Sequence, residues 1–365
     1  MLVSVFFVIL QVLIYTVFAM DERLDKVKVQ FSYLPLINFA IQQNSAPVIH
    51  QLSIENATSA PLKDIQVQIT AEPAFGNAVP TAIELIPAHG TVSLQPLSLT
   101  LSANYFTQLT ERLSGNLKIE ITSEASLIFT QTYPIDILAY DQWGGLNVLP
   151  EMLAAFITPN HTAILPIIKR AAAILGQWTD SPSLDEYQSR NPDRVRKQMA
   201  AIYTAISEQQ IIYSTIPASF EEYGQRVRLA DSVMAQKLGT CLDMSLLYAS
   251  CLEAIGLNPL IIITQGHAFA GAWLVPETFP DPTVDDVSLL TKRTAEGIYD
   301  ITLVETTCMN MGHQSDFDNA VKKANGKLTD GSNFMLAIDV KSKTFGDSSH
   351  PSTHIAWTDM GNRRE

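Results

Sequence analysis

The sequence predicts a mixed α+β protein in which an all-β region precedes a domain that begins with helices and ends with strands. Between residues 30 and 140, apolar side chains recur at every second position, which is the spacing of half-buried strands. From about residue 151 the apolar spacing becomes that of amphipathic helices, and after residue 256 short apolar runs return. Helices followed by strands are typical of α+β domains. With 47% hydrophobic and 17% charged residues, the 365-residue chain can bury cores in two or three domains.

The first element is a hydrophobic segment at residues 1–20, MLVSVFFVILQVLIYTVFAM. It carries no charge and is long enough to cross a bilayer. Val17-Phe18-Ala19 fits a signal-peptidase site, although the positive n-region of a signal peptide is missing. Three interpretations are open: a membrane anchor, a cleaved signal, or a start assigned too early with Met20 as the true first residue.

Residues 27–140 are predicted to form a β-sandwich. Apolar and polar residues alternate at 65–69 and at 117–121, and turn signals stand at 88–90 and 114–116. Several short strands at this spacing predict an immunoglobulin-like sandwich of about a hundred residues. The region contains no catalytic cluster, so we interpret it as a binding or spacing module.

The glycine pair and proline of residues 140–150, YDQWGGLNVLP, indicate a domain boundary, after which helices are expected. Predicted helices cover 151–157, 161–178 with Asn160 as cap, and 191–210 starting at Asn191-Pro192. A short strand is predicted at 211–214, followed by a loop over 218–239.

The centre of the second domain is the stretch from residue 237 to 274. Thr240 and Asp243 form a capping-box pair that starts a helix at Cys241, and Gly256 ends this helix. Strands are predicted at 260–263, 267–274, 298–304 and 334–340, with an insert of roughly twenty polar residues before the third.

Cys241 is the candidate nucleophile. At the first position of a helix, unpaired backbone N–H groups and the positive end of the helix dipole favour a thiolate. His267 follows 26 residues later at a strand start, a separation that fits a helix, a turn and one strand, so it is the candidate base. Cys251, deep in the same helix, is expected in the core, and Cys308 is not assigned a role.

A third residue should orient the imidazole. Glu305, at the end of the next strand, is preferred over Asp300 on the same strand, because a strand end lies nearer to a site at the sheet rim. For the developing oxyanion, the backbone N–H of Cys241 is one candidate donor and the side chain of Gln236 is another.

Several functions are disfavoured by composition and spacing. The net charge of −13 argues against direct nucleic-acid binding. No C-x-x-C pair and no glycine-rich phosphate loop is present, so neither a metal nor a cofactor is expected. Three cysteines with no disulfide pattern favour the cytoplasm, and the alternative is a membrane-anchored protein held through residues 1–20.

The motifs GTCLDMSLLYASCLEAIGLNPL, GHAFAGAWL and VETT resemble the transglutaminase-like branch of the papain-like cysteine enzymes. This resemblance implies a papain-like α+β domain over residues 146–345, with residues 346–365 as a tail. It also implies a triad of Cys241, His267 and Glu305. The family usually has Asp in a D-P-T-like context, where this chain has Glu305-Thr306-Thr307.

The motifs YDQWGG, AAFITPNH, PASFEEYGQRVR and GTCLD resemble the amino-terminal region of large bacterial proteins that continue into a superfamily-1 DNA helicase. No helicase motif occurs in this chain.

From the triad of Cys241, His267 and Glu305 we expect a cysteine-dependent hydrolase or acyl transferase acting on an amide bond of a protein or peptide, as a peptidase, deamidase or transglutaminase. The alternative is a catalytically inactive interaction module accessory to a helicase or DNA-processing system.

Overall fold

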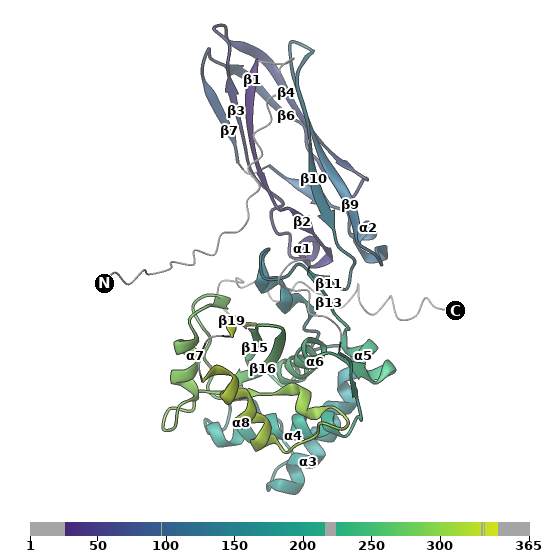
Figure 1. Cartoon of the computed structure of the whole chain (residues 1–365), viewed down its shortest axis with the longest axis vertical. Helices are drawn as coiled ribbons and strands as arrows, with labels where there is room; N and C mark the ends of the chain where they lie inside the picture. The colour runs from purple at the N-terminus through teal and green to yellow at the C-terminus, as the bar shows by residue number, and fades with distance from the viewer. Residues whose placement is uncertain (1–25, 96, 216–223, 330, 332, 342–365) are drawn as a thin grey trace. The chain divides into compact units, whose positions relative to one another are not determined.

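The computed structural model describes residues 26–95, 97–215, 224–329, 331 and 333–341. It is a mixed α+β protein with several sheets, as predicted (Figure 1). The chain divides into two compact units, Met1–Leu149 with Phe220–Gly224 and Pro150–Ser219 with Gln225–Glu365. The predicted segments 1–20 and 346–365 lie outside the described residues. Within the described ranges, no helix combines the length and the apolar character needed to cross a bilayer.

The first unit contains two antiparallel sheets and two short helices. The smaller sheet has the order β1-β3-β7, formed by β1 (Val27–Tyr33), β3 (Ile49–Asn56) and β7 (Thr91–Leu94). The larger sheet has the order β2-β10-β9-β4-β5-β8, with β6 (Thr81–Ile86) paired to β4. Its other strands are β2 (Leu36–Ile37), β10 (Ser126–Ile137), β9 (Leu113–Ser123), β4 (Leu62–Glu72), β5 (Gly76–Ala78) and β8 (Leu99–Leu101). β2 alone runs parallel to its neighbour. The helices are α1 (Phe39–Gln43) and α2 (Ala103–Gln108), and the last strand is β11 (Gln142–Trp143).

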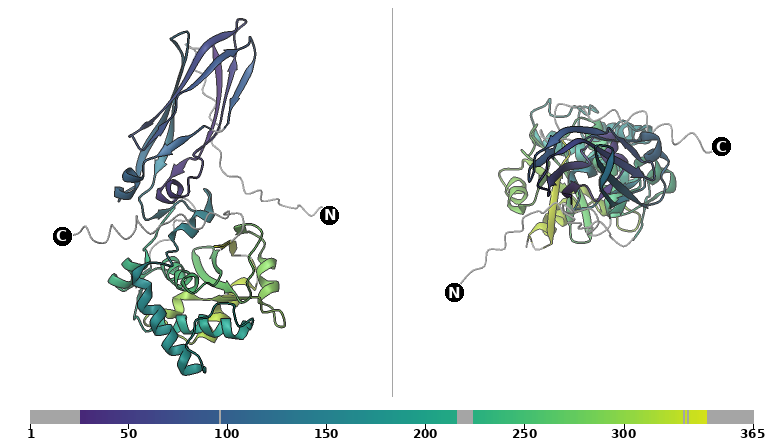
Figure 2. Two further views of the ribbon diagram at one scale, coloured as in Figure 1. Left: turned by 180° about the vertical axis from the view of Figure 1, so that it is seen from behind. Right: turned by 90° about the horizontal axis from the view of Figure 1, so that it is seen from above.

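The two sheets of this unit lie face to face (Figure 2). Phe31 on β1 and Tyr133 on β10 bring their ring centroids to 4.8 Å across the interior. Ile65 and Val67 on β4 are buried and their polar neighbours are exposed, which confirms the predicted alternation. This burial of one face is the reason why the sequence alternates with period 2.

One predicted turn is confirmed and another is wrong. At 88–90, His89 has a positive φ of 55° and Gly90 donates a hydrogen bond to the carbonyl of Pro87, so the chain turns there. At 114–116, however, β9 continues without a break. A Cβ on Gly115 would lie 2.7 Å from Ile137 Cδ1 and 3.0 Å from the carbonyl oxygen of Glu72, so close packing, and not a turn, favours glycine at this position.

The second unit contains most of the helices. They are η1 (Pro150–Phe156), η2 (Thr162–Ile164), α3 (Leu165–Trp178), α4 (Pro192–Ser207), α5 (Ala230–Gln236), α6 (Cys241–Ala254), α7 (Val287–Thr294), η3 (Thr306–Met309) and α8 (Phe317–Leu328). Asn191 caps α4 as predicted, accepting from the backbone N–H of Asp193. The predicted cap Asn160 is wrong, because His161 accepts from the N–H of Ala163 and a 3-10 turn precedes α3.

The loop predicted over 218–239 is also wrong in part, because α5 forms there. This helix has only seven residues and ends at Lys237, whose φ of 53° is left-handed. Its two buried residues, Ala230 and Val233, are too few to show a helical period in the sequence. Residues 218–223 of the same segment lie outside the described part of the chain.

The five-stranded sheet of the second unit has the order β17-β19-β15-β16-β18 and is antiparallel throughout. Its strands are β17 (Thr283–Val284), β19 (Phe334–Asp339), β15 (Pro259–Thr264), β16 (His267–Trp273) and β18 (Ile301–Val304). One buried hydrophobic cluster joins this sheet to two helices, because Ile262, Phe269 and Leu303 of the strands pack with Leu290 of α7 and Leu328 of α8.

Helix α6 packs against β15 and β16 (Figure 1). Because side chains alternate along a strand, Ala268, Ala270 and Ala272 of β16 point away from the cluster that contains Phe269, and their small size allows a helix to approach. All residues of β15 and β18 are buried. Coverage of both faces explains why these strands are continuous apolar runs in the sequence.

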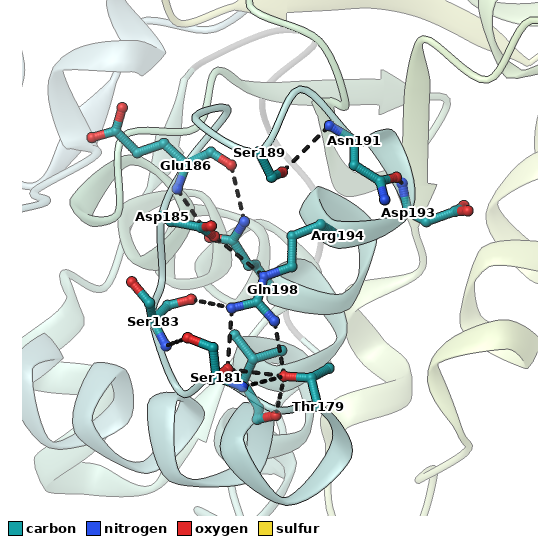
Figure 3. Close-up of polar contacts among 11 residues, drawn as sticks. Thr179, Ser181, Ser183, Asp185, Glu186, Ser189, Asn191, Asp193, Arg194 and Gln198 are labelled. Carbon is teal, nitrogen blue, oxygen red and sulfur yellow. Dashed lines mark hydrogen bonds and ion pairs between the residues drawn. The ribbon is translucent and has the colours of Figure 1, made fainter.

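The connection between α3 and α4 is held by Arg194, which lies on α4 (Figure 3). Its guanidinium donates to Thr179 Oγ1 at 2.8 Å, to the carbonyls of Ser181 and Ser183 at 3.1 and 2.6 Å, and to Asp185 Oδ1 at 3.3 Å. The Arg194 side chain is only 13% exposed. One cation therefore satisfies several acceptors of a segment that has no regular secondary structure.

Candidate active site

Cys241 is the first residue of α6 and its position is set by a capping box. Thr240 Oγ1 accepts from the Asp243 N–H at 3.2 Å, and Asp243 Oδ2 accepts from the Thr240 N–H at 2.9 Å, as predicted. The buried Asp243 carboxylate also accepts from the backbone N–H of Arg228 at 2.8 Å and from its guanidinium at 3.0 Å. These bonds fix the helix start, and Cys241 there is 8% exposed.

His267 is the first residue of β16, directly after the turn at Gly266, whose φ is +66°. The turn returns the chain antiparallel to β15, with His267 paired to Thr264. The imidazole is 19% exposed. The Cys241 side chain lies near enough for its hydrogen bond and charge to help raise the pKa of His267. The structure therefore brings together the sulfur and the imidazole that the sequence singled out.

Glu305 follows β18 directly, and its side chain is only 4% exposed. His267 Nε2 lies 2.9 Å from Glu305 Oε2. The other carboxylate oxygen accepts from Thr307, at 3.1 Å from its N–H and 2.7 Å from its hydroxyl. The backbone N–H of Glu305 donates to the carbonyl of Ala320 on α8, which ties this strand end to that helix.

The other two candidates lie elsewhere. Asp300 immediately precedes β18, so it lies at the opposite end of the strand from Glu305, roughly 16 Å away by the rise per residue. Gln236 is the last residue of α5 and is exposed. Neither residue is joined to Cys241 or His267 by any hydrogen bond found among the described residues.

Charges stabilise the pair of His267 and Glu305. Burial disfavours the imidazolium, but the hydrogen bonds to Cys241 and Glu305, together with their charges, raise the pKa of His267 to about 9. Burial also disfavours the Glu305 carboxylate, but the hydrogen bond and charge of His267, aided by Thr307, lower the pKa of Glu305 to about 2. At neutral pH this gives a carboxylate and an imidazolium, and an imidazolium beside a thiol favours the thiolate.

Tyr213 is a member of the site that the sequence did not indicate. It lies on β12 (Ile212–Tyr213), which pairs in parallel with β14 (Leu238–Gly239), immediately before the Cys241 helix. Burial, followed by the charge and hydrogen bond of the neighbouring Cys241 side chain, raises the pKa of Tyr213 to about 12. The hydroxyl therefore stays protonated and can donate. The proximity of Tyr213 to Cys241 follows only from the pairing of β12 with β14, which are far apart in the sequence.

The remaining cysteines differ from Cys241. Cys251 is fully buried in α6, as expected, and burial raises the pKa of its thiol. Cys308 is buried in η3, with its sulfur 3.4 Å from the Lys323 ammonium. All three are free thiols. Within the part of the chain that the structure describes, no three His, Cys, Asp or Glu side chains are grouped so as to hold a metal ion.

A cavity of about 420 Å³ opens beside the imidazole, and we call it the His267 cavity. It is lined by His267, Glu305, Thr307, Cys308, His313, Lys323, Gly326 and Lys327. Its volume lies within the range of roughly 300–1,000 Å³ that is usual for small-ligand sites. The site thus has a sulfur, an imidazolium and a carboxylate, and the imidazolium and the carboxylate border a space of the size of a small-ligand site.

The chain was compared with families and proteins of known identity. No protein-family model matches it, and no curated protein matches it.

Proposed function

We propose that the protein is a cysteine-dependent hydrolase or acyl transferase that acts on an amide bond through Cys241, His267 and Glu305. The observation that supports this is the 2.9 Å contact between His267 Nε2 and Glu305 Oε2, with the Cys241 side chain at the start of α6 near enough to the same imidazole to help raise its pKa. In nucleophilic catalysis the nucleophile lies beside a base, and an acid orients that base.

In the proposed reaction the Cys241 thiolate attacks the amide carbonyl carbon and forms a C–S bond. The imidazolium of His267 then gives its proton to the nitrogen as the C–N bond breaks, and the amine leaves. Water or a second amine, deprotonated by His267, attacks the thioester and releases the thiolate, which gives hydrolysis or transfer respectively.

The oxyanion formed in this reaction needs donors aimed at it. The backbone N–H of Cys241 lies at the start of α6, where N–H groups have no partner within the helix. The Tyr213 hydroxyl is a second donor next to the sulfur. Because Gln236 is exposed at the end of α5, Tyr213 is the better candidate for a side-chain donor.

We further propose that the second unit is a transglutaminase-like, papain-like domain and that the first is an immunoglobulin-like sandwich. In support of the former, a helix with a cysteine at its start packs against an antiparallel sheet whose neighbouring strands carry the histidine and the acid. In support of the latter, two mainly antiparallel sheets share an aromatic core around Phe31 and Tyr133. A protein or peptide is the proposed substrate.

The cytoplasm is the proposed location, because all three cysteines are free thiols and a thiolate nucleophile persists in a reducing compartment. Residues 1–20, through which a membrane location was considered, are not among the described residues.

Alkylation by iodoacetamide tests the function. Peptide mapping after a timed pulse at pH 7 should show Cys241 modified much faster than Cys251, which serves as an internal control because it is fully buried. Cys241→Ala should abolish amide hydrolysis or transfer while circular dichroism stays unchanged. If folded Cys241→Ala retains full biological function, the alternative applies: an inactive interaction module, for example one that accompanies a helicase or DNA-processing system.

A further inference from the structure

The His267 cavity is rich in basic groups, although the whole chain has a net charge of −13. Among the described residues, its lining includes Lys323, Lys327 and His313, and the only carboxylate there is that of Glu305. Glu305 already accepts hydrogen bonds from His267 and Thr307 and lies 3.6 Å from Lys327 Nζ. The cavity wall therefore presents more positive than negative charge to a ligand.

The two lysines come from one face of α8. Lys323, Gly326 and Lys327 are spaced i, i+3 and i+4, so they lie side by side along the helix. The adjoining face, with Ala320, Ala324 and Leu328, is buried in the domain. The contact of Ala320 with the Glu305 backbone holds this helix at the site.

Gly326 separates the two lysines and has no packing reason to be glycine. It lies inside α8, where glycine is less favourable than alanine. A Cβ added to Gly326 would meet no atom within 4 Å, and the residue lines the His267 cavity. The missing side chain leaves the cavity open at this position.

We propose that the His267 cavity binds a carboxylate of the substrate, on the side of the amine that leaves. This inference rests on the proposed function, in which His267 protonates the leaving amine, so groups bound next to His267 belong to the amine part of the amide. Lys323 and Lys327 pair with the carboxylate, and Gly326 leaves room for it. The carboxylate is either that of an acidic side chain or that of a chain end.

The first experiment compares two alkylating probes on the full chain. Iodoacetate and iodoacetamide have the same leaving group and differ in charge, so the ratio of their rates at Cys241 measures how well a carboxylate is accepted there. We expect Lys323→Gln and Lys327→Gln each to lower this ratio about two- to fivefold, the effect of removing one partly exposed ion-pair partner. Lys322→Gln is the matched control, because Lys322 is exposed on the same helix and does not line the cavity.

The second experiment identifies the source of the carboxylate. Three acetylated tripeptides are used to protect Cys241 from iodoacetamide: trialanine amide, trialanine with a free carboxyl end, and the amide with glutamate at its centre. Trialanine amide should give no protection. Protection by trialanine with a free carboxyl end supports the proposal and assigns the carboxylate to a chain end, and protection by the glutamate-containing amide supports it and assigns the carboxylate to a side chain. Gly326→Leu should remove this protection, because its side chain would enter the space for the ligand.

The two proposals can fail separately. If Cys241 reacts faster than Cys251 but the probe ratio is the same in the wild type, Lys323→Gln and Lys327→Gln, the carboxylate site is refuted and the nucleophile stands. Protection that is equal for all three peptides also refutes it. If Cys241 reacts no faster than Cys251, the proposed function fails, and the inference that rests on it fails as well.

Discussion

Replacing Glu305 by glutamine is the most direct test of how the site is charged. Glutamine has nearly the same shape and keeps an oxygen that can accept from His267, but it removes the negative charge. That charge and hydrogen bond are part of what raises the pKa of His267 to about 9. In Glu305→Gln we expect the imidazolium, and with it the thiolate of Cys241, to be less stable at neutral pH.

The structure sets the size of this effect. The difference between a pKa of about 9 and the ordinary value of 6.5 corresponds to roughly 3 kcal/mol in favour of the imidazolium. Cys241 and Glu305 share this stabilisation, so about half of it, roughly 1.5 kcal/mol, is assigned to Glu305. A loss of this size lowers the equilibrium constant for protonation of His267 about tenfold.

The assay is the rate of Cys241 alkylation by iodoacetamide between pH 5 and pH 10, followed by peptide mapping. We expect Glu305→Gln to react about tenfold more slowly than the wild type near pH 7 and to approach it at high pH, where any thiol ionises. Asp300→Asn is the matched control, because Asp300 lies at the far end of the same strand. Equal rates for folded Glu305→Gln and the wild type over the whole range would refute the assignment of Glu305.

Three further predictions concern the pH dependence, Tyr213 and Arg194. Because the pKa of His267 is raised in the folded protein, its stabilising contribution is complete below about pH 6.5 and is lost as the pH rises through about 9. In urea titrations, the difference in unfolding free energy between the wild type and His267→Asn should therefore shrink between these two pH values. Tyr213→Phe removes a donor to the thiolate and should slow Cys241 alkylation about fivefold with little change in melting temperature, so an unchanged rate counts against a donor role. Arg194→Met should cost about 2–4 kcal/mol in urea unfolding, since it leaves several acceptors unpaired. The exposed Arg170, paired with Glu208, is the comparison: Arg170→Met should cost under about 1 kcal/mol, and equal losses for the two would contradict the argument.

The parts of the fold that follow from local chemistry were predictable from the sequence. The start of α6 depends on a capping box within four residues, Thr240 to Asp243, and both of its hydrogen bonds form. The alternation at 65–69 follows from burial of one sheet face and is present in β4. Gly115 was misassigned to a turn because glycine also occurs where strands pack closely, and sequence alone does not separate the two causes.

The parts of the site that depend on distant pairings were not predictable. Tyr213 reaches Cys241 only because β12 pairs with β14, and nothing in the few residues around 213 indicates that partner. Helix α8 has apolar residues at helical spacing, namely Phe317, Ala320, Ala324 and Leu328, but nothing in this pattern indicates that the helix forms one wall of the His267 cavity.

The reacting residues and the two lysines of the His267 cavity have different roles in the proposed reaction. Cys241, His267 and Glu305 lie at a helix start, a strand start and a strand end, positions that local sequence patterns indicate. Lys323 and Lys327 lie on α8, which packs on the sheet through Ala324 and Leu328 and accepts a hydrogen bond from the Glu305 N–H at the Ala320 carbonyl. Substrate choice, on this view, depends on α8 and can change by substitution along one helix face while the reacting groups stay the same. The charge-reversing variant Lys323→Glu should therefore lower the ratio of the iodoacetate rate to the iodoacetamide rate further than Lys323→Gln does, without loss of the faster reaction of Cys241 relative to Cys251.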